Sequence, residues 1–112
     1  MVKVFAFLTR RNGLSTEAFI EHYENKHVPL VLSLAPAPLI YKRNYVVRGD
    51  EFNREDDAID FDVVTELVFA DRDVYEGWIE KLGVDAVAAD EHRFLDRART
   101  RAYVIDERSS AG

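Results

Sequence analysis

Hydrophobic residues along the chain follow two different spacings, one typical of strands and one typical of helices. Runs rich in Val, Phe, Leu and Tyr predict strands at residues 2–9, 39–47, 61–70 and 99–107. Apolar residues at helical spacing predict helices after Ser15, after Asp71 and over residues 84–97. The resulting order is βαββαβ, with a lengthened second crossover. It predicts an α+β, ferredoxin-like fold, in which a four-stranded antiparallel sheet carries its helices on one face.

The predicted strands are apolar on both faces, although a sheet with one wet face normally alternates apolar and polar residues. One face of the first strand carries Val4, Ala6 and Leu8, whereas the other carries Phe5 and Phe7. The helices of so small a domain can cover only one face. We therefore predict a homodimer in which the second faces pack together. The alternative is a monomer whose strands tolerate apolar residues on an exposed face.

Composition narrows the class of protein. The 112 residues predict one domain over residues 1–106, a long loop at residues 48–60 and a disordered tail at residues 107–112. The net charge of −6 argues against nucleic acid and anionic membrane surfaces as partners, since both favour clusters of Lys and Arg. No apolar run approaches the roughly 20 residues that span a bilayer. The start of the chain is expected to be a strand, not a signal peptide. With no cysteine, disulfides and thiol nucleophiles are excluded, and a cytoplasmic location is expected.

The stretch FIEHYENKHVPLV, residues 19–31, places an imidazole in the apolar stripe of the first helix. Tyr23 and His27 share that stripe, and Pro29 disfavours helical backbone at the residue before it. A short separate helix or a kinked continuation should follow. An imidazole beside an opened helix end can transfer protons near neutral pH. The alternative is a core histidine that bonds a backbone carbonyl.

The other two histidines give no sign of a metal site. Because five residues at 100° each separate them, His22 and His27 should lie about 140° apart on an α-helix. His22 is therefore expected on the surface, and His92 likewise. We predict no metal and no cofactor.

Several carboxylates and tyrosines remain as candidates. Glu91 falls on the apolar side of the third helix, where it needs a hydrogen bond and suits an acid–base role, unless Glu91 or Asp90 faces water. Asp62 and Glu66 share a face of the third strand, and Arg43, Arg99 or Arg101 could pair with them.

Tyr41 and Tyr45 alternate along the second strand and suit either a pocket for flat ligands or a dimer interface. Trp78 is expected in the core. The sequence contains no glycine-rich phosphate loop and no Ser-His-Asp spacing, so nucleotide cofactors are disfavoured.

The stretch FLTRRNGLSTEAFIEHYENKHVPLV resembles the opening of EthD-domain proteins: a strand, a GLS turn, a helix with F and Y, and H-x-P-L. FDVVTELVF and ADEHRFLDRARTRAYVIDE resemble that family's third strand and closing segment. The resemblance covers most of the chain apart from residues 48–60. It implies a dimeric α+β barrel, with a small apolar cavity between the sheet and the helices of each subunit.

The resemblance also implies candidate roles. Relatives include fungal dehydratases and decarboxylases of aromatic polyketides, polyketide cyclases and lactone isomerases, and the founding member is linked to bacterial ether degradation beside a haem monooxygenase. His27 matches the histidine of H-x-P-L and is the candidate for proton transfer. Asp62 matches the aspartate that opens the third strand, and Asp90 and Phe94 match the closing segment. Where the family's second strand often ends in a histidine, this chain has Tyr45.

These observations lead to one hypothesis and two alternatives. We expect a cofactor-free lyase or isomerase, of dehydratase, decarboxylase or cyclase type, that acts on a small aromatic or polyketide-like compound. His27 would move the proton, Tyr41 or Tyr45 would orient an oxygen, and Asp62 or Glu91 would fix the imidazole tautomer. The further residues expected to bind substrate are Phe7, Tyr23 and Phe94. The alternatives are a non-catalytic binding or accessory module and a cofactor-free monooxygenase of an oxidative degradation pathway.

Overall fold

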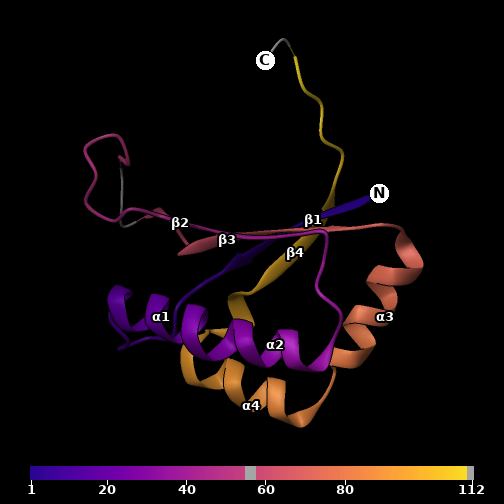
Figure 1. Cartoon of the computed structure of the whole chain (residues 1–112). Coiled ribbons are helices and arrows are strands. Elements are labelled where there is room, and N and C mark those ends of the chain that lie inside the picture. The colour runs from indigo at the N-terminus through magenta and orange to yellow at the C-terminus, as the bar shows by residue number, and fades with distance from the viewer. Residues whose placement is uncertain (55–57, 111–112) are drawn as a thin grey trace.

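The structure, a computed structural model, describes residues 1–54 and 58–110 (Figure 1). Its strands are β1 (Val2–Leu8), β2 (Ile40–Tyr45), β3 (Val63–Phe69) and β4 (Arg101–Ile105). Its helical segments are α1 (Thr16–His22), the π-helical turn η1 (Tyr23–His27), α2 (Val28–Leu34), α3 (Arg72–Leu82), α4 (Asp85–Phe94) and the 3-10 turn η3 (Arg97–Arg99). The predicted order βαββαβ is confirmed. The last strand is shorter than predicted because η3 occupies its expected start.

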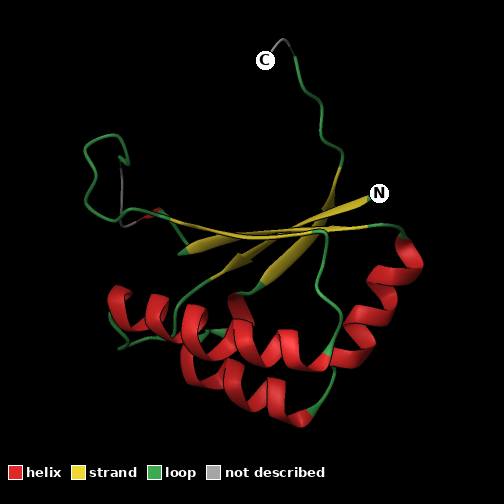
Figure 2. Ribbon diagram, viewed as in Figure 1, coloured by secondary structure: helices red, strands yellow, loops and turns green. Residues whose placement is uncertain are grey.

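The four strands form one antiparallel sheet in the order β2-β3-β1-β4. The helices lie on one face of this sheet, with α3 at its end, and within the described residues the other face carries no helix (Figure 2). This is the predicted ferredoxin-like α+β arrangement. The expected N-caps also form, because the side chains of Ser15 and Asp71 accept hydrogen bonds from the amides of Ala18 and Val74.

Alternation along the strands divides their side chains between the two faces. Val4 and Leu8 of β1 point toward the helices and belong to two core clusters, one around Phe19 and Phe94 and one around Phe69. Phe7 points to the face without helices, where its ring meets Phe61 at 5.3 Å. The helical layer and one sheet face therefore form the core of the subunit.

The first crossover is one continuous helix with a π turn in its middle, not two separate helices. From residue 16 to residue 34 the backbone stays helical, and the amide of Val28 donates to the carbonyl of Tyr23, five residues earlier. Pro29 follows immediately. A proline ring clashes with the carbonyl four residues before it in a regular α-helix, and a local widening relieves such a clash. This resolves the predicted choice in favour of a continuation.

The C-terminal residues 106–110 carry no helix or strand, and the rest of the predicted tail, residues 111–112, lies outside the described part. The predicted loop at residues 48–60 likewise includes residues 55–57, which are not described. None of the described helices is long and apolar enough to cross a bilayer.

Candidate functional site

A cavity of about 350 Å³ lies between the helices and the sheet face that they cover. Most of its wall is apolar and comes from β1, β3, α2 and α3, including the only tryptophan, Trp78. Besides Trp78, the residues with polar groups that line it are Tyr23, His27, Tyr41, Thr65, Tyr75, Glu91 and Thr100. This volume and this mixture of an apolar wall with a few polar groups are typical of small-molecule sites.

His27 is the titratable group that the π turn presents to this cavity. It is 7% exposed, and its Nδ1 lies 2.9 Å from Oδ2 of Asp90 on α4. Within the described residues, Nε2 of His27 has no hydrogen-bond partner. An ionised carboxylate can only accept, so Nδ1 carries the hydrogen of the neutral ring and Nε2 keeps its lone pair. This arrangement prepares Nε2 to accept a proton.

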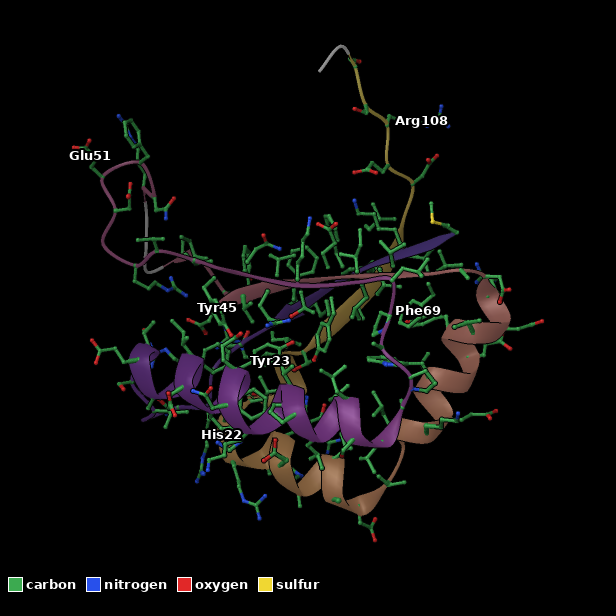
Figure 3. All side chains as sticks on the ribbon, viewed as in Figure 1. His22, Tyr23, Tyr45, Glu51, Phe69 and Arg108 are labelled. Atoms are coloured by element: carbon green, nitrogen blue, oxygen red, sulfur yellow. The ribbon has the colours of Figure 1, made fainter. Side chains whose placement is uncertain are left out.

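Asp90 holds a second imidazole with its other oxygen. Nε2 of His22 lies 2.9 Å from Oδ1, and the His22 ring stacks on Phe94 with 4.7 Å between centroids. The His27 ring contacts the same Phe94 at 4.9 Å. Figure 3 shows His22 toward α4 and Tyr23 between the helix and the sheet. One buried carboxylate therefore joins two histidines over one aromatic ring.

The two imidazoles determine the ionisation of Asp90. Burial by itself would raise the pKa of this carboxyl, but the hydrogen bonds from His27 and His22 outweigh burial and hold the pKa below its usual value. The exposed Arg93 adds a cation 3.5 Å from Oδ1. Asp90 is therefore an anion at neutral pH.

The sequence predicted His22 on the surface, but the structure places it against Asp90, and the π turn explains the difference. In a regular α-helix the two histidines point in different directions, whereas a turn bonded from residue i to residue i+5 brings residues five apart onto one side. The prediction for His22 was therefore wrong. The predicted surface position of His92 is confirmed, since it is exposed and bonded to Arg97.

Two tyrosines and a threonine form a second polar group in the cavity. The Tyr23 hydroxyl lies 2.6 Å from Oγ1 of Thr65. Burial raises the pKa of Tyr23 well above its usual value and raises the pKa of Tyr41 to about 12. Both phenols therefore keep their protons at neutral pH and can donate hydrogen bonds to an oxygen of a ligand.

Glu91 lines the cavity as predicted, but it does not contact His27. Its Oε1 lies 3.4 Å from Nε of Arg97, and its side chain is 27% exposed. The carboxylate that fixes the imidazole is Asp90, so the expectation that Glu91 or Asp62 would do so is wrong.

Tyr45 lies outside this cavity. Its hydroxyl donates to Oε2 of Glu24 at 2.5 Å, and Arg43 donates to both oxygens of the same carboxylate. The Arg43 hydrogen bond is the main reason why the pKa of Glu24 is lowered. The guanidinium also lies 4.9 Å from the centre of the Tyr41 ring. This network fastens β2 to η1 and supports one wall of the cavity.

Asp62 lies at the end of the sheet, in a different and more polar depression. Its Oδ2 accepts the backbone N–H of Arg10 at 2.7 Å, and its Oδ1 accepts Nη2 of Arg48 at 3.0 Å. Its arginine partners therefore differ from the ones predicted from the sequence. Glu66 pairs with Lys3 at 3.4 Å on the face without helices. Asp62 therefore connects the loops that follow β1 and β2 at this end of the sheet.

Neither of the predicted phenylalanines lines the cavity. Phe7 lies on the opposite face of the sheet, because it follows the other parity of β1. Phe94 is fully buried and packs against both histidine rings. Trp78 packs on Phe69 in the core, as predicted, and also borders the cavity.

Two residues to which the sequence analysis gave no task in the site complete it: His22 was expected on the surface, and Asp90 was named as a match to the family's closing segment, without a role. Asp90 could have been found from the spacing of Val87, Asp90 and Phe94, the buried residues of α4, which lie three and four positions apart. His22 could not be found in this way, since only the π turn brings it to Asp90. In the described residues no group of three or more His, Asp or Glu side chains is arranged to hold a metal ion.

Comparison with known proteins agrees with the fold. An ethyl tert-butyl ether (EthD) family protein from Bacillus halodurans superposes with a TM-score of 0.65 at 22% identity, over 96% of this chain and 99% of that protein. A protein from Arabidopsis thaliana is also similar. Its crystal structure gives a TM-score of 0.58 at 14% identity over 99% of both chains, and its solution structure gives 0.60 at 16% identity over 99% of this chain and 89% of that one.

The sequence comparison assigns the family. No functionally curated protein matches this sequence. The sequence profile of the EthD domain matches residues 11–98, which is well over half of the chain and contains α1, η1, α2 and α4. This chain therefore belongs to the EthD domain family.

Proposed function

We propose that the protein binds a small, flat, largely apolar compound in the cavity and moves a proton on it without a cofactor. The observation that carries this proposal is His27, a buried imidazole in the cavity wall whose Nδ1 is held by the ionised Asp90. A base whose second nitrogen is fixed by a carboxylate is the usual arrangement for general acid–base catalysis. The substrate class is an aromatic or polyketide-like compound with an enolisable or phenolic group.

The proposed step is deprotonation next to a carbonyl. The C–H bond breaks, the proton goes to Nε2 of His27, and the electron pair moves to the carbonyl oxygen to form an enolate. The imidazolium that forms is stabilised by Asp90 at 2.9 Å. Tyr41, whose phenol stays protonated, donates to the developing oxyanion. Dehydration, cyclisation and double-bond migration can proceed from such an enolate.

An exchange experiment tests this step before the natural substrate is known. 1-Tetralone is flat, largely apolar and enolisable, and mass spectrometry in D2O follows the exchange of its α-hydrogens. We expect the protein to accelerate the exchange, and His27→Gln to reduce the rate by about a hundredfold or more, the contribution of a general base. His92→Gln, at an exposed histidine on α4, is the matched control and should leave the rate unchanged.

Two other outcomes distinguish the alternatives. If 1-tetralone changes the fluorescence of Trp78 but no α-hydrogen exchanges, the cavity belongs to a binding or accessory module. Oxygen uptake on adding a dihydroxynaphthalene would indicate a cofactor-free monooxygenase, in which the deprotonated substrate reacts with dioxygen. Exchange that survives His27→Gln would overturn the assignment of the base.

We further propose that two copies pair through the sheet face without helices. That face carries Phe5, Phe7 and Val64, which are only half-buried in the single chain, and the more exposed Tyr103. Burying such a patch is favourable, and a second copy is the simplest complementary surface. Sedimentation velocity should give a dimer for the wild type and a monomer for Val64→Lys. Glu80→Lys, at an exposed position of α3, should stay dimeric, and a wild-type monomer would contradict the proposal.

A further inference from the structure

The proposed proton transfer uses one histidine, yet the structure supplies two to the same carboxylate. His22 and His27 each lie 2.9 Å from a different oxygen of Asp90. Asp90 and His27 are almost fully buried, whereas the His22 side chain is 20% exposed. The deprotonation step gives no role to His22. Its hydrogen bond to Asp90 still needs an explanation, because a buried carboxylate is costly unless its oxygens are hydrogen-bonded.

The hydrogen bond from His22 restricts how Asp90 can turn. Without the hydrogen bond from His22, Asp90 can rotate away from Nδ1 of His27 toward the neighbouring Arg93, whereas a carboxylate held at both oxygens has one orientation. Because His22 occupies Oδ1, Oδ2 is directed at Nδ1 of His27. The ring of Phe94 packs against both imidazoles, at 4.7 Å from His22 and 4.9 Å from His27.

The surrounding charges leave this arrangement intact. The other titratable groups near the cluster are Arg93, which pairs with Asp90, Tyr23, whose ring lies 5.6 Å from that of His27, and Tyr41 and Glu91, which line the same cavity. Arg93 lies 3.5 Å from Oδ1 but is mostly exposed, and Arg97 pairs with Glu91. The two phenols are protonated at neutral pH. Within the described residues, no other charged group makes a hydrogen bond or ion pair with Asp90.

We propose that His22 is a positioning residue, which acts through Asp90 to hold His27 in its Nδ1–H tautomer with Nε2 free to accept a proton. The proposal rests on the proposed function for its catalytic consequence, but the tautomer itself is a property of the resting protein. The π turn is the structural device that makes it possible, since it brings positions 22 and 27 to one side of the helix.

Two substitutions separate the hydrogen bond from the packing. His22→Gln keeps an N–H donor for Asp90 and loses the aromatic stack, whereas His22→Phe keeps a ring on Phe94 and loses the donor. The chain has only three histidines, so nitrogen-15 NMR can identify the tautomer of each, with His92 as an internal reference. We expect His27 to be the Nδ1–H tautomer in the wild type and in His22→Gln, and a mixture of tautomers in His22→Phe.

The exchange assay gives the catalytic readout. His22→Phe should lower the maximal rate of 1-tetralone exchange by about tenfold, the effect of one lost charge-assisted hydrogen bond. The affinity of the His22→Phe variant for 1-tetralone, followed by Trp78 fluorescence, should equal that of the wild type. The His22→Gln variant should keep most of the wild-type rate. If the wild type does not exchange 1-tetralone, the proposed function fails while the NMR result still tests the tautomer. A single Nδ1–H tautomer of His27 in His22→Phe, or an Nε2–H tautomer in the wild type, would overturn the inference.

Discussion

Asp62 and Asp90 are equally buried, each with 6% of its surface exposed, but their partners differ in kind. Asp62 accepts from a backbone amide and an arginine at the end of the sheet. Asp90 accepts from two imidazoles beside the cavity. An amide and a guanidinium keep their protons throughout the physiological range, whereas an imidazole gains and loses its proton near neutral pH.

On the proposed function, this difference separates a structural carboxylate from one that supports proton transfer. Asp62 holds Arg10 after β1 and Arg48 after β2, so it fixes the loops that leave the sheet. Asp90 places a titratable ring in the wall of a largely apolar cavity. Burial alone therefore does not identify a functional carboxylate. The ability of its partners to exchange protons, and their position beside a cavity, distinguish the two sites.

The largest effect that we expect comes from Asp90→Asn. An amide cannot accept from both imidazoles, because one of its two ends is an N–H donor, and one of the histidines must then change its tautomer. The rate of 1-tetralone exchange should fall by about a thousandfold, within the contribution of a general base, because a misdirected imidazole no longer acts as one. Asp62→Asn, at the matched buried position, should keep the rate within about twofold. Equal losses in the two variants would remove the distinction between the sites.

The next effect concerns stability at the other site. Asp62→Ala removes the acceptor of the buried Arg10 amide and one partner of Arg48, so the free energy of unfolding should fall by about 3 kcal/mol. Urea denaturation measures this change. Asp60→Ala is the control, because its half-exposed side chain only pairs with Arg101 at the surface and should cost less than about 0.5 kcal/mol. A similar small loss for Asp62→Ala would show that its hydrogen bonds are not structural.

A smaller effect is expected within the cavity wall. Tyr23→Phe removes a hydroxyl that lies 2.6 Å from Thr65, leaving a buried threonine without its partner, and should cost about 1 kcal/mol. Adding Thr65→Val removes the second hydroxyl as well. In a double-mutant cycle the pair of changes should therefore cost less than the sum of the single changes. Strict additivity would mean that the two hydroxyls do not support each other.

The fold could be predicted from the sequence because its signals are local and repeated. Strand runs, helical stripes and the caps at Ser15 and Asp71 each depend on a few neighbouring residues. The parity of β1 also predicted correctly that Phe5 and Phe7 lie on the face opposite Val4 and Leu8. Phe7, which we expected to bind substrate, does not line the cavity, because the same parity directs it away from the helices.

The site was less predictable because it depends on backbone geometry and on long-range contacts. His27, Tyr23, Tyr41 and Glu91 line the cavity as expected. His22 was misplaced because a wheel with 100° per residue does not describe a π turn. Asp62 was chosen for its position in the family pattern. It lies just before β3, however, and the aspartate that bonds His27 is Asp90 on α4. The hydrogen bond between His27 and Asp90 joins residues that are far apart in the sequence, so no local pattern predicts it.

The smallest effect that we expect is the response of Asp90 to acid. Burial alone would raise the pKa of Asp90, but the hydrogen bonds from His27 and His22 outweigh it and hold the folded-state pKa below the usual value. The ionised form therefore contributes stability that is fully present above the unfolded-state pKa and is lost as the pH falls through the folded-state value. Asp90→Asn lacks this contribution. The difference in the free energy of unfolding between wild type and Asp90→Asn should shrink as the pH is lowered from about 5 to about 2 in urea titrations. A difference that stays constant over this range would mean that the two imidazoles do not hold Asp90 as an anion.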